Sequence, residues 1–361
     1  MSAAKRVVNG TVVDDGRTVL GYDVIGDMHG HLVALEQLLA EMGYTCIDGV
    51  WSHPTRVAVF VGDMVDRGAA QEGLVRTVMR MVAAGSALVC IGNHEYNAVA
   101  WATPFECPPG SNDRNSGRSH CRDHNEKNWL QHRAFLEQVV EDSSTHHEFR
   151  DWFSSLPLWL DLQLGDARLR VVHACWHEES MQVLRGLMPD GHLTTDAVVA
   201  TSVKGSPEYE ALEIVLKGPE VCMGDRYYLD HSDTPRCKAR VRWWDATATT
   251  LDRLALIPKG ALTPEGEPFP PLPATPVEGV PRYTGDVPVI VGHYWEKVPV
   301  ALYSDLVAST DYSLARNGPA VAYRWDGEQV LTADHYFVHW VRHPGPDDVA
   351  DPGELGDDRN D

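Results

Sequence analysis

The sequence predicts an α/β fold, because short apolar strand patterns alternate with amphipathic helical patterns along its N-terminal third. An apolar pair at residues 24–25 precedes a polar loop, and leucines then follow at helical spacing as far as Met42. The order repeats from the apolar run at residues 57–61, and residues 87–91 supply a third strand. This succession predicts a sheet with parallel strands covered by helices. Ligands of such sheets bind in the loops at the carboxyl ends of the strands.

The middle and the end of the chain continue the alternation. Residues 129–140 predict a helix, and residues 158–173 predict a hairpin whose strands are separated by Gly-Asp. Residues 197–217 predict two helices separated by Gly-Ser-Pro. A further strand is expected at residues 287–291, and a second hairpin is expected at residues 320–332 across Asp-Gly.

Two segments without periodicity are expected to leave the sheet as surface excursions, residues 103–128 and residues 217–285. The second contains eight prolines between residues 258 and 281, which resist regular structure. Residues 344–361 hold seven carboxylates, one arginine and no aromatic side chain, so we expect a disordered acidic tail. The sequence therefore predicts one domain over residues 1–343.

The composition of the chain argues against binding to nucleic acids, against a membrane span and against a secreted disulfide framework. The chain has 31 Lys+Arg against 52 Asp+Glu, a net charge of −21, which opposes binding to the phosphate backbone of nucleic acids. No apolar run approaches the roughly 18 residues of a membrane span, and no apolar leader follows the first residues. Seven cysteines without regular spacing argue against a disulfide framework, so a cytoplasmic protein is expected.

Three short segments share one design, in which an apolar strand ends in glycine and polar residues follow. The segments are Gly26-Asp27-Met28-His29-Gly30, Gly62-Asp63-Met64-Val65-Asp66-Arg67-Gly68 and Gly92-Asn93-His94-Glu95. Two later strands are followed by His173 and by His293. Glycine allows a close backbone approach to an ion or a phosphate, and oxygen with nitrogen ligands suits borderline divalent metals.

These motifs resemble those of the calcineurin-like metallophosphoesterases, in particular the phosphoprotein phosphatase branch and its bacterial relatives. That branch has the pattern GDxHG, GDxxDRG and GNHE or GNHD, followed by two isolated histidines, and all thirteen specified positions of the first three blocks occur here. The resemblance covers roughly residues 20–340. It implies a four-layer fold in which two mixed β-sheets pack face to face and helices flank them.

The resemblance also implies a centre of two divalent metal ions, with Mn²⁺ expected and Fe or Zn as alternatives. One ion would be held by Asp27, His29 and Asp63, and the other by Asp63, Asn93, His173 and His293. Ions that share a carboxylate polarise a phosphoryl group and lower the pKa of a bridging water.

Four further residues acquire roles from the resemblance. Arg67 would clamp two phosphoryl oxygens, His94 would protonate the leaving oxygen, and Asp66 would orient that imidazole. A second arginine is expected between the last two histidines, where Arg240 and Arg242 are candidates and Arg242 is favoured. Glu95 has no evident ligand role and is expected to be structural.

The expected function is metal-dependent hydrolysis of phosphoric esters, with a phosphomonoester of a protein or small molecule as substrate. A dinucleoside polyphosphate such as diadenosine tetraphosphate is the alternative substrate. A metal-dependent binding module without activity is a more remote alternative. Such a module would be expected to have lost His94, Asp66 or a ligand, and all of these residues are present. Cysteines and histidines within residues 107–124 and 222–237 lack the tight spacing of zinc sites.

Overall fold

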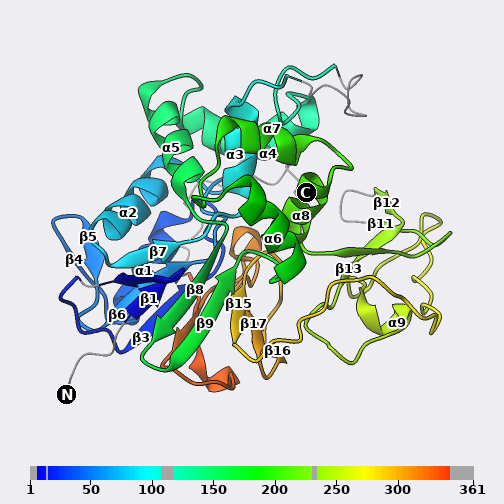
Figure 1. The fold of residues 1–361 in the computed structure, drawn as a ribbon. Helices are drawn as coiled ribbons and strands as arrows, with labels where there is room; N and C mark the ends of the chain where they lie inside the picture. The colour runs from blue at the N-terminus through cyan, green and yellow to red at the C-terminus, as the bar shows by residue number, and fades with distance from the viewer. Residues whose placement is uncertain (1–5, 14, 107–116, 230–233, 342–361) are drawn as a thin grey trace, which may run out of the picture.

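A computed structural model of the chain describes residues 6–13, 15–106, 117–229 and 234–341 (Figure 1). The acidic tail expected at residues 344–361 lies outside the described residues. So do the middle of the first excursion and residues 230–233 of the second. Within the described residues, no helix has both the length and the apolar character needed to cross a membrane.

A five-stranded mixed sheet carries the first three motifs. Its order is β19-β18-β3-β6-β7, and β3 (Gly21–Ile25), β6 (Arg56–Phe60) and β7 (Ala87–Val89) run parallel. The strands β18 (Ala320–Trp325) and β19 (Tyr336–His339) close one side in antiparallel pairing. Both β3 and β6 are buried along their whole length, as strands covered on two faces must be.

A seven-stranded mixed sheet carries the two later histidines. Its strand β15 runs parallel to both neighbours, whereas the strands toward each edge pair antiparallel. In sheet order the strands are β16 (Leu302–Ser304), β17 (Val307–Ser309), β15 (Val289–Val291), β9 (Ala167–Val172), β8 (Trp159–Leu164), β1 (Arg6–Val8) and β2 (Thr11–Val13). The hairpin β8–β9 is the one that the Gly-Asp turn predicts.

The two sheets pack face to face through alternate side chains of their strands. One buried apolar cluster joins Val24 and Val59 of the five-stranded sheet to Leu162, Val171 and Ile290 of the other. Residues of the opposite parity belong to a second cluster that they share with the helices. The four layers expected from the resemblance are therefore confirmed.

Helices cover the outer faces. The helix α1 (Leu32–Glu41) contacts β18 and β19, and α2 (Gln71–Ala83) contacts β7. On the other side α6 (Glu178–Leu187) packs on α8 (Pro207–Lys217), and Val215 O accepts a hydrogen bond from Ala174 N at the end of β9. The remaining helices are α3 (Asn93–Ala102), α4 (Glu126–Gln138), α5 (Ser144–Ser155), α7 (Thr195–Ser202) and α9 (Leu251–Leu254).

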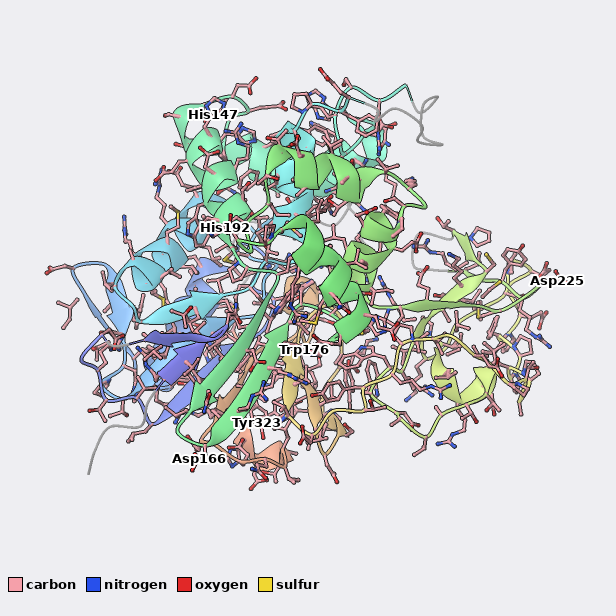
Figure 2. The ribbon with its side chains drawn as sticks, in the orientation of Figure 1. His147, Asp166, Trp176, His192, Asp225 and Tyr323 are labelled. Carbon is pink, nitrogen blue, oxygen red and sulfur yellow. The ribbon has the colours of Figure 1, made fainter. Side chains whose placement is uncertain are left out.

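The second excursion contains a small sheet of its own, formed by β10 (Glu220–Cys222), β13 (Lys238–Val241) and β14 (Ala255–Leu256). This insertion projects beside the two main sheets in Figure 1, and Figure 2 shows Asp225 at its outer edge. The minor strand pairs are β11 (Tyr228–Leu229) with β12 (Pro235–Arg236), and β4 (Thr45–Ile47) with β5 (Val50–Ser52). As the prolines predict, residues 258–281 contain neither helix nor strand.

One sequence expectation is wrong. Residues 329–332 do not pair with β18 to form a hairpin, because both edges of β18 are taken, one by β3 and the other by β19. The Asp-Gly turn leads the chain away instead, and Leu331 N donates to Asp305 O near the other sheet.

Candidate metal centre

The predicted ligands come from five strand ends that meet at one edge of the two sheets. The five-stranded sheet supplies the residues after β3, β6 and β7, and the seven-stranded sheet supplies those after β9 and β15. All six predicted ligand residues are buried there, namely Asp27, His29, Asp63, Asn93, His173 and His293. Within each sheet a backbone bond ties neighbouring strand ends together, since Gly292 N donates to His173 O and Gly26 N donates to Val321 O.

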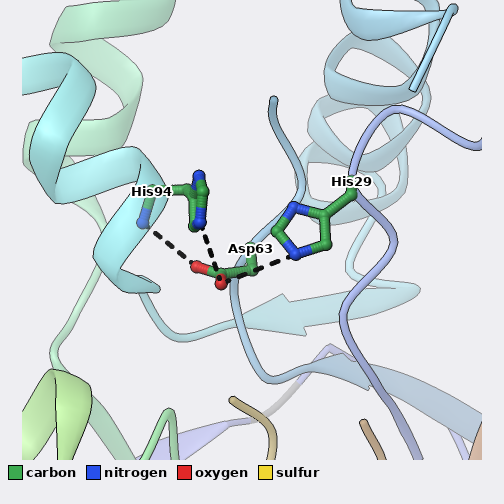
Figure 3. Close-up of side chains that lie close together, drawn as sticks. All are labelled: His29, Asp63 and His94. Atoms are coloured by element: carbon green, nitrogen blue, oxygen red, sulfur yellow. Dashed lines mark hydrogen bonds and ion pairs between the residues drawn. The ribbon is translucent and has the colours of Figure 1, made fainter. Parts of the chain in front are cut away.

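The Asp63 carboxylate lies between the imidazoles of His29 and His94 (Figure 3). Its Oδ2 atom is 3.8 Å from His29 Nε2 and 3.8 Å from His94 Nε2. Its Oδ1 atom is 3.3 Å from His173 Nε2 and accepts a hydrogen bond from His94 N at 3.1 Å. Asp63 thus belongs to two groups of candidate metal ligands, one with His29 and His94 and one with His173 and His293.

Asn93 and Asp27 complete the two groups. The Asn93 Oδ1 atom lies 2.9 Å from His173 Nε2 and 3.0 Å from His293 Nδ1. The Asp27 carboxylate accepts a hydrogen bond from His293 N at 3.1 Å, so it lies beside the backbone of His293. The structure therefore brings all six predicted ligands together.

Backbone carbonyls determine which ring nitrogen is protonated in two of the histidines. His29 Nδ1 is 2.8 Å from Val65 O, and His173 Nδ1 is 2.8 Å from Val61 O. Because a carbonyl only accepts, each Nδ1 carries a proton, which leaves each Nε2, on the side of Asp63, as the atom able to bind a metal ion. Metal-bound histidines are oriented in this way in proteins.

The electrostatics of the cluster also fit bound cations. Burial, followed by the charges of Asp311 and Asp63, raises the pKa of Asp27 well above its usual value. Burial would raise the pKa of Asp63 too, but neighbouring histidines, His173 first, hold it well below its usual range. Burial lowers the pKa of His293 and of His29, so both imidazoles are neutral as metal ligands require. Burial would lower the pKa of His173, but the Asp63 carboxylate outweighs it and raises that pKa, so positive charge is favoured at this place.

Close backbone contacts explain the glycines of the motifs. A Cβ atom on Gly92 would lie 2.2 Å from Asp63 Oδ1 and 2.4 Å from Asp63 N, and one on Gly292 would lie 2.1 Å from Asp27 Oδ1. The turns that carry His29, Asp63 and His293 are left-handed, with φ of 41°, 52° and 70°. Strained backbone of this kind persists where surrounding contacts over-determine it.

Glu95 supplies those contacts, in agreement with the structural role expected for it. Its Oε2 accepts from Asp63 N at 2.8 Å and from Gly92 N at 3.0 Å, while its Oε1 accepts from Met64 N at 2.7 Å and from Val65 N at 3.2 Å. One buried carboxylate thereby fixes two motif loops relative to each other.

His94 and Asp66 are hydrogen-bonded, and Asp66 has a second histidine partner. His94 Nδ1 is 2.6 Å from Asp66 Oδ2, and His132 Nδ1 is 2.8 Å from Asp66 Oδ1. Burial alone would lower the pKa of His94, but the carboxylates of Asp63 and Asp66 outweigh it and raise that pKa to about 9. His132 was not predicted from the sequence, because it lies in a helix far along the chain with no motif around it.

Arg67 points toward His94, with Nη2 at 3.4 Å from His94 Nε2. Its guanidinium lies 3.9 Å from the ring centre of Trp295, and the guanidinium of Arg316 lies 4.3 Å from the same ring. Trp295 is held in place at its backbone, since its N–H donates to Asp311 Oδ2 at 2.8 Å. Trp295, Arg316 and Asp311 were also missed, and only the position of Trp295 two residues after His293 could have indicated it.

The two candidate arginines lie on the same face of the chain at β13 but have different surroundings. Arg240 donates to Lys217 O at the end of α8, and its charge is second only to burial in lowering the pKa of His293. Arg242 Nη1 donates to Arg253 O at 3.2 Å, within the insertion. Of the two arginines, Arg240 is therefore the one whose charge acts on a predicted metal ligand.

The other metal hypotheses gain no support within the described residues. Cys121 donates to Pro104 O, and the rings of His120 and His124 stack at 4.0 Å, so none of them forms part of a candidate ligand group. Cys107 and His231 lie outside the described residues. A third candidate group, Asp142 with His146 and His147, lies at the start of α5, away from the strand ends.

Known proteins share this arrangement of motifs. A model of the calcineurin-like phosphoesterase family matches residues 22–198. The bis(5'-nucleosyl)-tetraphosphatase PrpE (asymmetrical) of Oceanobacillus iheyensis is 41% identical over 73 residues, 20% of this chain and 29% of the relative. The protein of the same name from Bacillus subtilis is 37% identical over 76 residues, 21% of this chain and 31% of the relative.

Solved structures are similar at low identity. A cold-active protein-tyrosine phosphatase of a Shewanella species is 14% identical and has a TM-score of 0.41, over 89% of this chain and 80% of that one. The curated relatives are matched over less than a third of their length. From the family match and the motifs together, residues 22–198 belong to the calcineurin-like phosphoesterase family.

Proposed function

We propose that this enzyme hydrolyses phosphomonoesters with the help of two divalent metal ions. The observation that carries the proposal is the position of Asp63, whose two carboxylate oxygens face different groups of histidines. A carboxylate shared in this way is the usual bridge of a dinuclear centre, which supplies Lewis acidity and an activated water.

The proposed ligands are those of the sequence analysis. Asp27, His29 and Asp63 would hold one ion, and Asp63, Asn93, His173 and His293 would hold the other. The mixture of oxygen and imidazole ligands suits Mn²⁺, and also iron or zinc, and we propose Mn²⁺. The six cysteines in the described parts of the chain are free thiols, which suits the cytoplasmic location that we propose.

His94 and Arg67 would act directly on the substrate. The proton of His94 Nε2 faces the centre, because Nδ1 is engaged by Asp66, so His94 can donate it to the departing oxygen. The planar guanidinium of Arg67 can bind two phosphoryl oxygens, and Trp295 holds it in one orientation. We propose Arg240 as the second phosphate-binding arginine in place of Arg242, because its charge reaches His293.

The first experiment measures metal content together with turnover of p-nitrophenyl phosphate. We expect about two equivalents of transition metal, loss of activity with a chelator and recovery with Mn²⁺. Asp63→Asn should lose most metal and activity. Asp142→Asn is the matched control, because it changes the exposed third ligand group, and it should leave both unchanged. Activity that survives complete removal of metal would refute the proposal.

A groove beside the centre supports the alternative substrate, a dinucleoside polyphosphate. It has a volume of about 640 Å³ and passes Tyr96 and Asn97, which follow His94 on α3, and Arg240 of the insertion. Its described lining contains eight Lys and Arg residues and four carboxylates, in a chain whose net charge is −21. A positive groove in an acidic protein attracts an extended anion, and the relatives named tetraphosphatases match the chain in part.

A substrate panel separates the two candidates. It compares kcat/KM for phosphoserine, phosphothreonine and phosphotyrosine peptides, sugar phosphates, mononucleotides and diadenosine tetraphosphate. We expect the monoesters to be cleaved fastest. Cleavage of the tetraphosphate at least a hundredfold faster than any monoester would replace the first candidate with the second.

A further inference from the structure

Asp66 holds two imidazoles, and the proposed acid His94 is only one of them. Asp66 Oδ2 meets His94 Nδ1 at 2.6 Å, and Asp66 Oδ1 meets His132 Nδ1 at 2.8 Å. Both histidines and the carboxylate are buried. We propose that His132 is a positioning residue that holds Asp66 in the orientation that His94 needs, an inference that rests on the proposed role of His94 as the acid.

The surroundings of His132 define its tautomer. An ionised carboxylate only accepts hydrogen bonds, so His132 Nδ1 carries a proton and donates it to Asp66. His132 Nε2 is buried without a hydrogen-bond partner among the described residues. The ring stacks on Phe135 with centres 4.9 Å apart, and its centre is 5.9 Å from that of Trp101. His132 is thus a rigid donor whose one polar partner in the described part of the chain is Asp66.

A fixed second donor matters because a carboxylate can rotate about its Cβ–Cγ bond. The backbone of Asp66 is already fixed, since its N–H donates to Gln71 Oε1 at 2.7 Å. Without His132, however, Oδ1 would be a buried acceptor with no donor, and the carboxylate would gain by turning toward another donor or a water. Such a turn would lengthen or bend the bond to His94. His132 therefore acts on the leaving-group proton through Asp66 and touches no substrate.

The test is the dependence of turnover on the leaving group in His132→Leu. An acid matters most for poor leaving groups, so kcat should fall about tenfold or more on an alkyl or phenyl phosphate and change little on p-nitrophenyl phosphate. KM and metal content should stay near wild type. Because a smaller folded fraction would reduce all substrates equally, the ratio between substrates separates positioning from misfolding.

Two further variants sharpen the test. His132→Asn can place its amide N–H near the position of Nδ1, so it should recover much of the activity on poor leaving groups. His146→Leu is the matched control, because His146 is also buried, lies near Phe135 and makes no hydrogen bond to Asp66. It should leave the ratio between substrates unchanged.

The double variant His94→Asn with His132→Leu tests whether the two histidines act as one unit. If His132 acts only through His94, the double variant should be no slower than His94→Asn alone. Additive losses, or an equal loss on all substrates in His132→Leu, would overturn the inference and leave the acid role of His94 intact. A His94→Asn variant with no dependence on the leaving group would instead refute the acid role, and this inference with it.

Discussion

The strand-end loops and the insertion differ in how tightly their functional groups are held. In the loops, Asp63 is 2% exposed and the Glu95 carboxylate binds four backbone N–H groups around it. In the insertion, the Lys238 side chain is 61% exposed and its nearest ion pair, to Glu220, spans 4.0 Å. The comparison indicates that the loops fix the chemistry, whereas the insertion offers an adaptable wall. Substitutions in the loops should therefore reduce metal binding and turnover, and those in the insertion should mainly change KM.

The largest effect is expected for Gly92→Ala. The added Cβ would lie 2.4 Å from the backbone N of Asp63, which cannot move without moving the bridging carboxylate. Displacement of about 1 Å at a reaction centre costs roughly 10²-fold in rate, so we expect a loss of at least that size together with metal.

The same substitution at Gly186 provides the control. Gly186 lies in α6 with no atom within 4 Å of an added Cβ, and Gly→Ala in a helix stabilises by about 0.5–1 kcal/mol. Metal analysis, turnover and urea unfolding of both variants would check the contrast. Wild-type metal content in Gly92→Ala would contradict the rigidity that we assign to the loops.

Glu95→Ala should be the next most harmful change. It would leave four N–H groups of buried loop residues without their acceptor, and each unsatisfied buried group costs about 1–3 kcal/mol, less where water enters. We expect the free energy of unfolding to fall by about 3 kcal/mol or more, measured in urea, with weaker metal binding. Glu137→Ala, on the exposed face of α4, should change stability by less than about 0.5 kcal/mol.

The strand-end loops also show how much of the candidate site could be predicted from the sequence. Four of the six predicted ligands, together with Asp66, Arg67 and His94, lie within short motifs, because a strand, a glycine and a turn determine their placement locally. The paired sheets could be anticipated from the same motifs through the resemblance. The sequence analysis could assign Glu95 a structural role but could not name its partners, which depend on how two loops meet.

Residues that reach the site from distant elements could not be predicted. His132 lies 66 positions from Asp66, and Asp311 follows an edge-side strand of the other sheet. Neither has a spacing that distinguishes it from an ordinary helical or turn residue. The misassigned hairpin at residues 320–332 has the same origin, since the choice of partner for β18 depends on which strands already flank it.

Arg240→Gln and Arg242→Gln test whether one arginine of the insertion acts together with the strand-end loops at the reaction centre. If Arg240 binds the phosphoryl group, its loss should reduce kcat/KM on p-nitrophenyl phosphate roughly 10²-fold, as loss of one transition-state donor does. Arg242→Gln should change kcat/KM by less than about threefold, since its guanidinium binds Arg253 O instead. Urea unfolding is needed as well, because Arg240 also donates to Lys217 O. The opposite ranking would restore Arg242 as the second phosphate-binding arginine.

The smallest effect is expected for Lys238→Gln, within the groove wall of the insertion. Its exposed pair with Glu220 should contribute little to stability, so the melting temperature should change by no more than about a degree. The charge of Lys238 acts through solvent, and a multiply charged substrate such as diadenosine tetraphosphate should bind only about two- to fivefold more weakly, with kcat unchanged. That difference should shrink at 0.5 M salt, where exposed charges are screened within a few ångströms.

The control is Lys297→Gln, which changes an exposed lysine outside the groove and should show neither the change in KM nor its salt dependence. Equal behaviour of the two variants would mean that the insertion does not bind the extended anion, and that the contrast between the loops and the insertion is one of rigidity alone.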